Sequence, residues 1–245
     1  MKFETKLIKG IIHKRYKRFL ADVELLEDTE INKKGDIIVA HTANTGSMKT
    51  CWEAGWNVLL SYHDNPKRKL KYSLEMTHNE NTWIGVNTAL PNKLAFEAIQ
   101  NGVVKEVQGY EHIKPEAKIG NSRIDLWLYN GEKKNPTDQC YVEVKNVTLL
   151  GNDGVVLFPD GVSERGQKHL RELIGLKREG IRACMLYIVQ REDVSIFSPA
   201  KEIDPTYAAL LKEAYAEGVE ILVYQCSLSN LAVDVVKSIP FNLDN

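Results

Sequence analysis

The sequence predicts an all-β region followed by a mixed α/β region within one chain. Residues 1–90 contain short strand-like runs separated by turn residues, as at Lys33-Lys-Gly35 and Asn79-Glu-Asn81. From Pro91 onward, apolar helical patterns alternate with strand patterns, which is typical of a sheet covered by helices on both faces. A length of 245 residues accommodates two domains of ordinary size.

The N-terminal region is expected to form a small barrel or sandwich, because it carries several short strands with regular turns. An OB-like barrel fits this pattern, and its open strand face is a recurrent nucleic-acid platform. We place the domain boundary near Thr88, which gives an OB-like domain at 1–88 and a second domain at 89–245. The predicted strands are Leu7–Ile12, Phe19–Leu26, Asp36–Ala40, Asn57–His63, Tyr72–Asn79 and Thr82–Val86.

The second region opens with a predicted helix, Pro91 to Gln100, which has proline near its start and Gly102 after its end. A helix at 161–179 follows, with Asp160 or Ser163 able to cap its start and Gly180 ending it. The remaining predicted elements are a strand at 183–190, a helix at 205–217 and a strand at 219–225.

A hairpin between these two helices carries the main chemical signal. Residues 124–129 and 141–147 each alternate apolar and polar side chains with a period of two, and the connector 130–138 contains turn-forming steps. Folding the hairpin about Lys134 places Asp125 opposite Glu143, and directly opposed residues share one side of a sheet. Lys145, two residues beyond Glu143, shares that side as well.

Two adjacent carboxylates beside an ammonium group predict a site for a hard divalent cation. Like charges directly opposed are destabilising unless a cation or a proton lies between them, so removing Glu143 is expected to relieve repulsion. Asp125 and Glu143 supply the oxygen ligands that such a cation prefers. A surface ion-pair cluster is the alternative explanation. Glu116 is either a third acid or a solvated side chain, and His169 is the one histidine beside the predicted site.

The spacing Asp-x(17)-Glu-x-Lys resembles the core motif of the PD-(D/E)XK nuclease superfamily, with Ile124 in place of the leading proline. The resemblance implies that Asp125 and Glu143 hold Mg²⁺ or Mn²⁺ together with the backbone carbonyl of Val144. It also implies that Lys145 orients or deprotonates the attacking water and offsets charge on the phosphate. Asp125, Glu143 and Lys145 are therefore the predicted catalytic residues.

Longer blocks extend this resemblance over nearly the whole chain. RYKRFLADVEL at 15–25, NTGSM at 44–48, SRIDLWL at 122–128, YVEVKNVTL at 141–149, FPDGVSERGQKHLREL at 158–173 and FSPA at 197–200 are similar to the bacterial and archaeal sugar fermentation stimulation protein A family. This resemblance implies a DNA-binding protein with an N-terminal OB-like barrel and a C-terminal PD-(D/E)XK-type domain.

The distribution of charge favours a nucleic-acid partner, although the net charge is only -1. Residues 1–90 hold 14 Lys and Arg against 11 Asp and Glu, and the basic residues cluster beside aromatic ones. A solvated charged edge is the alternative. The predicted nucleic-acid contacts are Arg15, Lys17, Arg18, Lys67 and Arg68, with Arg165 and Lys168 on the helix beside the metal site. The loop 44–48 either contacts phosphate or is a tight turn shaped by Gly46.

Several classes of protein and site are excluded. No apolar run approaches the ~20 residues of a membrane span, and the first residues lack the apolar core of a signal peptide. The four cysteines have no C-x-x-C spacing, which disfavours zinc and predicts buried free thiols in a reducing cytoplasm. We expect a cytoplasmic protein without a membrane partner.

Two functional hypotheses remain. The first is a DNA-binding protein without strong sequence specificity, whose divalent-metal site cleaves phosphodiesters of DNA or RNA. The second is a non-catalytic DNA-binding regulator of sugar-metabolism genes that keeps only the nuclease scaffold. A sugar-metabolism enzyme has no support, since the chain shows no P-loop, dinucleotide fingerprint or Ser-His-Asp arrangement. The oligomeric state stays open.

Overall fold

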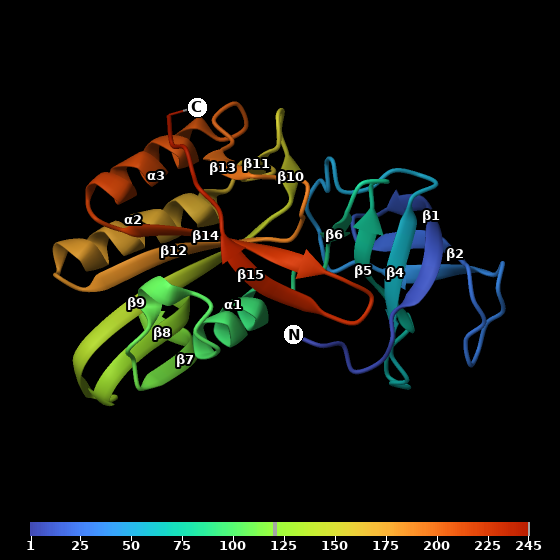
Figure 1. The fold of residues 1–245 in the computed structure, drawn as a ribbon, viewed down its shortest axis with the longest axis horizontal. Coiled ribbons are helices and arrows are strands. Elements are labelled where there is room, and N and C mark those ends of the chain that lie inside the picture. The colour runs from blue at the N-terminus through green and yellow to red at the C-terminus, as the bar shows by residue number, and fades with distance from the viewer. Residues whose placement is uncertain (120–121, 245) are drawn as a thin grey trace.

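The computed structural model describes residues 1–119 and 122–244, which form two lobes side by side (Figure 1). The N-terminal lobe contains β1 (Ile8–Tyr16), β2 (Leu20–Leu25), β3 (Ile37–His41), β4 (Asn57–Tyr62), β5 (Tyr72–His78) and β6 (Trp83–Gly85). The C-terminal lobe contains α1 (Pro91–Gln100), a short 3₁₀ turn (Lys105–Val107), β7 (His112–Ile119), β8 (Ser122–Glu132), β9 (Asn135–Val147), β10 (Leu149–Leu150), β11 (Val155–Phe158), α2 (Glu164–Arg178), β12 (Arg182–Val189), β13 (Ile196–Pro199), α3 (Pro205–Ala216), β14 (Glu220–Leu228) and β15 (Val233–Ser238).

The N-terminal lobe is the predicted OB-like barrel. Its strands follow the order β3-β2-β1-β4-β5-β6, and a parallel pairing of β3 with β5 closes the first five into a barrel. Closure leaves the inward side chains in one apolar core, which includes Ile12, Val23, Leu60 and Leu74. All six predicted strands are confirmed, although β1 continues past its predicted end to Tyr16.

The C-terminal lobe is built on a mixed sheet with the order β15-β14-β12-β9-β8-β7. Strands β9, β12 and β14 run parallel, and the remaining pairs are antiparallel. Such a sheet must bury both faces, and two separate apolar clusters do so. Helix α1 packs in one cluster, whereas α2 and α3 pack in the other.

Helix α1 has its predicted bounds, α3 ends one residue before its predicted end, and α2 begins three residues after and ends one residue before its predicted bounds of 161–179. Ser163 caps α2 by accepting a hydrogen bond from Gly166 N, and Gly180 follows the helix with a φ of 80° that favours glycine. Helix α3 ends before Gly218, which also has a positive φ. Among residues 1–119 and 122–244, no helix is long and apolar enough to cross a membrane.

The hairpin of β8 and β9 has the predicted register. Leu126 pairs with Val142 and Asn130 with Asp138, which centres the pairing on Lys134 before a shift near the turn. The structure adds strands that the sequence analysis did not predict, namely β10, β11 and β13, which form a small separate sheet, and the edge strand β15. All four cysteines are buried and free, as predicted.

A fully buried arginine joins the two lobes. Arg191, which follows β12, donates to both carboxylate oxygens of Asp193 at 2.6 and 2.8 Å. It also donates to the backbone carbonyl of Thr148 at 2.7 Å, and to that of Thr50 in the barrel at 3.4 Å. Asp193 in turn accepts a hydrogen bond from Asn79 of the barrel at 2.9 Å. A buried charge needs this full set of partners, so the arginine holds both lobes in one arrangement.

Close backbone contact reinforces this junction. Gly85 N at the end of β6 donates to Gln190 O at 2.9 Å, and a β-bridge joins Ile84 to Arg191. A Cβ atom on Gly85 would lie 2.5 Å from the side-chain oxygen of Gln190. Only glycine therefore allows this approach without displacing Gln190.

The junction generates a stability prediction. Asp193→Asn should lower the free energy of unfolding by about 3–5 kcal/mol, because it leaves a buried guanidinium without its counter-charge. Asp64→Asn is the control, since Asp64 is exposed and pairs with Lys71 at 3.7 Å; it should cost less than about 1 kcal/mol. Urea unfolding of the three proteins measures the difference, and equal losses in the two variants would contradict the role assigned to Asp193.

The difference in stability between wild type and Asp193→Asn should depend on pH. Burial raises the pKa of the Asp193 carboxyl, but hydrogen bonds from Arg191 and Asn79 outweigh it, so the pKa lies below its ordinary value. The stabilisation by the carboxylate is complete above the unfolded pKa of about 3.9 and is lost as pH falls through the lower folded pKa. The stability gap between wild type and Asp193→Asn should therefore be constant near neutral pH and shrink below about pH 4.

Candidate active site

Strands β8 and β9 separate at Asp125, and its carboxylate fills the gap. The last pair on this side is Leu126 with Val142. Beyond it, Asp125 Oδ2 accepts a hydrogen bond from Val144 N at 2.8 Å. A backbone N–H of β9 is thus satisfied by a side chain instead of by the neighbouring strand. Asp125 Oδ1 accepts from Asn92 Nδ2 in the first turn of α1, also at 2.8 Å.

Glu143 lies at the centre of a buried polar cluster on the α2 side of the sheet. Its Oε1 accepts from Lys145 Nζ at 2.6 Å and also contacts Nδ1 of His169, a residue of α2. Lys145 Nζ lies 3.4 Å from the same histidine nitrogen. Glu143 is 1 % exposed and His169 5 % exposed, so the three groups interact away from bulk water. In this setting each charge depends strongly on its partners.

The environments of the two acids shift their pKa values in opposite directions. Burial raises the pKa of the Glu143 carboxyl, but the contacts with His169 and Lys145 outweigh it, so the net pKa lies below the ordinary value. The pKa of Asp125 is raised, first by burial and then by the nearby charge of Glu143. Groups whose pKa values are pushed apart in this way are typical of sites that move protons.

The geometry corrects one expectation about the pair. From the sequence, the removal of Glu143 is expected to relieve its repulsion with Asp125. In the structure, Glu143 pairs with Lys145 and His169, so its removal would leave a buried lysine without its carboxylate. Loss of Glu143 is therefore expected to destabilise the protein.

The donor set suits a hard divalent cation that keeps part of its water shell. The second carboxylate oxygen of Glu143, Oε2, is buried and has no hydrogen-bond partner in the described part of the chain. Each oxygen of Asp125 accepts one hydrogen bond and retains a free lone pair. The described residues contain no group of three or more His, Cys, Asp or Glu placed to hold a metal ion. Mg²⁺ commonly binds through one or two carboxylates, with water and phosphate completing its shell, so the residues present fit such an ion.

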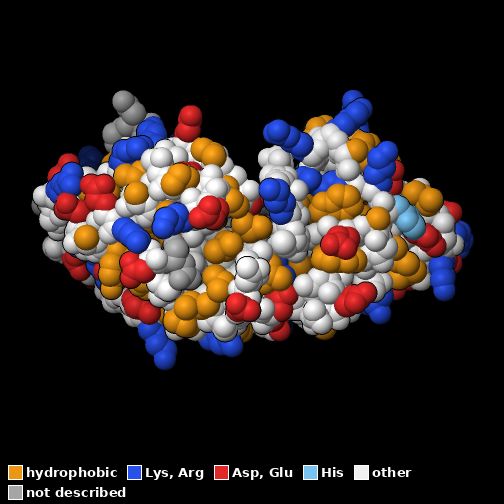
Figure 2. Space-filling model, turned by 90° about the horizontal axis from the view of Figure 1, so that it is seen from above, with side chains coloured by type: hydrophobic (Ala, Val, Ile, Leu, Met, Phe, Trp, Pro, Cys, Tyr) orange, Lys and Arg blue, Asp and Glu red, His pale blue; other side chains and the backbone are white. Residues whose placement is uncertain are grey.

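A cleft of about 640 Å³ lies between the two lobes, close to the start of α2. Its walls are two polar loops, 44–48 from the barrel and 158–163 from the C-terminal lobe, together with Arg15 and Arg18. A Cβ atom on Gly46 would lie 2.7 Å from a carboxylate oxygen of Asp160, so the loops approach closely. Figure 2 shows the surface hollowed between the lobes, with Lys and Arg side chains along the barrel side of the hollow.

Of the predicted nucleic-acid residues near the β1–β2 turn, Arg15 has a structural role, whereas Lys17 and Arg18 are exposed. The guanidinium of Arg15 donates to the carbonyls of Arg18, Asn44 and Gly46, at 2.6 to 2.9 Å, and so holds the loop 44–48 in place. Asn44 Oδ1 accepts from Gly46 N, which makes this loop a tight turn. Lys17 and Arg18 lie in the exposed turn between β1 and β2 and have positive φ values.

The other predicted nucleic-acid residues lie on separate elements. Lys67 is exposed in the loop between β4 and β5, and Arg68 donates to Ser73 Oγ at 2.9 Å. Arg165 and Lys168 are exposed on α2, where Lys168 lies 3.6 Å from Glu172. Glu116, considered as a third acid, is exposed and pairs with Arg123 at 3.3 Å, so it lies outside the buried cluster.

Sequence reasoning missed the residues that connect the acids to the helices. Asn92 gave no signal, because it is an ordinary first-turn residue of α1 whose contact with Asp125 depends on the tertiary fold. His169 was noted only for its place in the chain. Its direct contact with Glu143 became visible once α2 was packed against the sheet.

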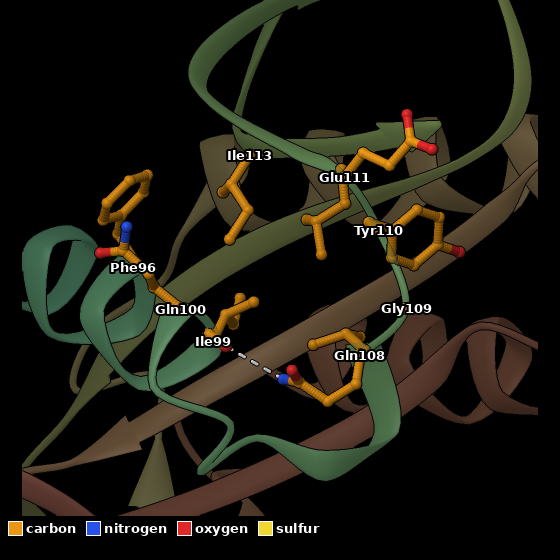
Figure 3. A pocket seen from close by; sticks show the side chains of 10 residues that line it. Phe96, Ile99, Gln100, Gln108, Gly109, Tyr110, Glu111 and Ile113 are labelled. Carbon is orange, nitrogen blue, oxygen red and sulfur yellow. Dashed lines mark hydrogen bonds between the residues drawn. The ribbon is translucent and has the colours of Figure 1, made fainter. Parts of the chain in front are cut away.

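A separate hollow of about 240 Å³ lies between α1 and the segment leading into β7 (Figure 3). Phe96, Ile99 and Ile113 line it, and Gln108 closes one side by donating to Ile99 O at 3.0 Å. None of the predicted catalytic residues lines this hollow. The candidate chemistry therefore stays with Asp125, Glu143, Lys145 and His169.

Two family descriptions match the chain in succession. Residues 14–86 match the SfsA N-terminal OB domain, and residues 89–231 match the sugar fermentation stimulation protein RE domain. Curated relatives are similar over their full length. The sugar fermentation stimulation protein homolog of Geotalea uraniireducens is 48 % identical over 236 residues, covering 96 % of each chain. That of Syntrophotalea carbinolica is 44 % identical over 244 residues, covering 100 % of each chain.

A solved structure supports the same relationship. The structure of Pyrococcus furiosus SfsA in complex with Ca²⁺ is 29 % identical to the chain and superposes with a TM-score of 0.81. The match covers 99 % of this chain and 98 % of the other. The whole two-lobed arrangement is therefore shared with that protein.

The buried cluster generates a prediction about coupling. Glu143→Gln and Lys145→Met should each lower the free energy of unfolding by about 3–5 kcal/mol, because each leaves a buried charge without its main partner. The double variant should cost less than the two losses together, with a coupling of about 1–3 kcal/mol. Denaturant unfolding of the wild type and the three variants measures this coupling.

An exposed ion pair provides the control cycle. Lys33 and Asp28 lie 3.0 Å apart, with side chains 78 % and 60 % exposed. Lys33→Met and Asp28→Asn should show a coupling below about 1 kcal/mol. If the Glu143–Lys145 coupling is no larger than this control value, the two residues do not act as a buried pair.

Proposed function

The chain belongs to the sugar fermentation stimulation protein family, and on this premise we propose that it is a cytoplasmic DNA-binding protein that hydrolyses phosphodiester bonds with a divalent cation. The observation that carries this proposal is the buried Glu143, whose second oxygen has no hydrogen-bond partner among the described residues, while Lys145 and Asp125 lie close by. Buried free thiols are consistent with a reducing compartment.

Asp125 and Glu143 would hold Mg²⁺ or Mn²⁺, with the backbone carbonyl of Val144 as a third ligand. The Ca²⁺ in the complex of the Pyrococcus furiosus relative supports a divalent ion. When bound, such an ion supplies Lewis-acid stabilisation of the phosphate and lowers the pKa of a water molecule.

Side chains around the bound ion would supply the other functions that hydrolysis requires. The Lys145 ammonium, held by Glu143, is placed to donate a hydrogen bond to the attacking water and to offset negative charge on the phosphate. His169 contacts both partners, so it positions them. Asn92 and Val144 N fix the orientation of Asp125, which limits the motion of a ligand oxygen during the reaction.

DNA would lie across the cleft between the lobes. Lys17 and Arg18 approach it from the barrel, whereas Arg165 and Lys168 approach from α2, and Lys67 and Arg68 extend the basic surface. Contacts of this type go to phosphates and carry little sequence information. Arg15 shapes the loop 44–48 and adds positive charge behind it.

A second candidate function is DNA binding without cleavage. One observation favours it, because both Lys145 and His169 already contact the same oxygen of Glu143. A carboxylate engaged in this way can serve as a structural anchor in a scaffold that no longer performs chemistry. The cleavage experiment below separates the two candidates.

The DNA-binding proposal predicts strong salt dependence. If about five phosphates are neutralised, affinity should fall by about two to three orders of magnitude between about 50 and 200 mM salt. The double variant Lys17→Gln/Arg18→Gln should bind more weakly and reduce the slope of log affinity against log salt by about two. Lys212→Gln, an exposed lysine on α3 that pairs with Asp244, is the control. Fluorescence anisotropy with labelled DNA provides the measurement; affinity insensitive to salt would exclude the proposed phosphate contacts.

The cleavage proposal predicts separable effects at two positions. Glu143→Gln should abolish Mn²⁺ binding in calorimetry, because it removes a ligand charge. Lys145→Ala should retain Mn²⁺ and DNA binding but lose about two to four orders of magnitude in the rate of cleavage. Supercoiled, linear and single-stranded DNA with Mg²⁺ or Mn²⁺ are the substrates. Equal cleavage by wild type and Lys145→Ala, or none by either, would leave DNA binding as the function.

A further inference from the structure

Strands β7, β8 and β9 expose a face that none of the long helices within residues 1–119 and 122–244 covers. On the α2 side of the sheet, α2 packs mainly on β12 and α3, whereas α1 contacts β7 and β9 from the opposite side. The three strands extend away from α2 and α3 in Figure 1. Away from Ile124 and Glu143, the side chains that they present on the α2 side therefore face solvent or one another, although Tyr141 also packs against the α2 cluster.

The register of these strands aligns aromatic side chains in two rows across that face. In one row, His112 of β7 lies opposite Tyr129 of β8. In the next row, Lys114 lies opposite Trp127, which lies opposite Tyr141 of β9. The alternation of a strand brings both rows to the same face.

The rings form one continuous stack. Trp127 and Tyr129 lie 4.2 Å apart between centroids and are nearly parallel, and Trp127 and Tyr141 lie 5.9 Å apart at an angle of 10°. His112 extends the stack, with its centroid 4.7 Å from that of Tyr129. Trp127 Nε1 donates to Gln139, so the central ring is held in place. His112 is exposed and the two tyrosines are half-buried, which leaves π surface accessible at both ends.

Positive charge borders the stack. Lys114 Nζ lies 6.0 Å from the centre of the Trp127 ring. Lys133, exposed at the tip of the hairpin, lies close enough to Lys114 to lower its pKa through a side-chain contact and charge repulsion. The neighbouring acid Glu111 is engaged, since it accepts from Gly131 N at 3.1 Å. Two adjacent ammonium groups beside stacked rings are complementary to a polyanion that carries aromatic bases.

The stack of aromatic rings lies next to the candidate active site along β9. Tyr141 and Glu143 lie two residues apart on β9, about 7 Å along the strand, and both face the α2 side. Asp125 lies two residues before Trp127 on β8, where its carboxylate reaches Val144 N of β9 and Asn92 of α1. A chain whose bases stack on the half-buried Tyr129 and Tyr141, on either side of the buried Trp127, would therefore carry its backbone towards Glu143.

We propose that the face formed by His112, Lys114, Trp127, Tyr129 and Tyr141 binds unpaired nucleotides, and that the substrate of the adjacent site is single-stranded nucleic acid or a single-stranded extension. The proposal rests on the proposed function and specifies its substrate class. Paired bases hide their faces within a duplex, so only unpaired bases can stack on side chains. An open sheet face with rings and lysines provides such a surface.

Binding in EDTA tests the proposal without cleavage. The probes are a fluorescein-labelled single-stranded DNA of about 12 nucleotides and the blunt duplex of the same length. Tyr129→Leu and Tyr141→Leu should each weaken single-strand binding by about 5- to 150-fold, from about 1–3 kcal/mol per stacked base, and should change duplex binding much less. Lys114→Gln should reduce the salt slope of single-strand binding by about one. Tyr215→Leu, an exposed tyrosine on α3, is the matched control.

Tryptophan fluorescence gives an independent readout. The single-stranded probe should quench the wild-type emission, and Trp127→Phe should remove most of that quench. Unchanged single-strand affinity in both tyrosine variants, while the wild type still binds DNA, overturns the platform and leaves the proposed function intact. Loss of all DNA binding by the wild type overturns the proposed function itself. Quenching by maltohexaose and not by the oligonucleotide would also overturn the platform, and would assign the stack to carbohydrate.

Discussion

The arrangement of the molecule depends on one buried charge. Arg191 has no solvent exposure, so its guanidinium must find every partner within the protein. Those partners come from both lobes: Asp193 and Thr148 from one, Thr50 and, through Asp193, Asn79 from the other. The barrel and the C-terminal sheet are thereby held at one angle. The cleft between the loops 44–48 and 158–163 exists because that angle is maintained.

Burial also governs the two acids of the candidate site, but their different partners shift their pKa values in opposite directions. Burial would favour the neutral form of both acids, yet only Glu143 contacts the Lys145 ammonium and the His169 imidazole. Glu143 therefore stays ionised, while Asp125 is held by neutral donors and shifts in the opposite direction. Two carboxyl groups on neighbouring strands thus acquire different proton affinities from their surroundings alone.

Local patterns predicted much of this structure. The period-two alternation of β8 and β9 gave their register about Lys134, since a pleated strand assigns each side chain to a face. Ser163 and Gly180 marked the ends of α2, because capping is a local interaction. The junction at Arg191, the contact of Asn92 with Asp125 and the aromatic rows depend on segments far apart in the chain. Strands β10 and β13 are too short to show a pattern.

The separation of β8 from β9 also bears on how relatives of this protein should be compared. Asp125 satisfies the backbone of Val144, so a relative that has lost all chemistry would still need an acceptor at this position to preserve its sheet. An aspartate there is accordingly a poor marker of activity. Lys145 makes no comparable hydrogen bond to the backbone, since its ammonium contacts only Glu143 and His169 among the described residues. If the proposed cleavage holds, the lysine is therefore a better marker of it among relatives than the aspartate.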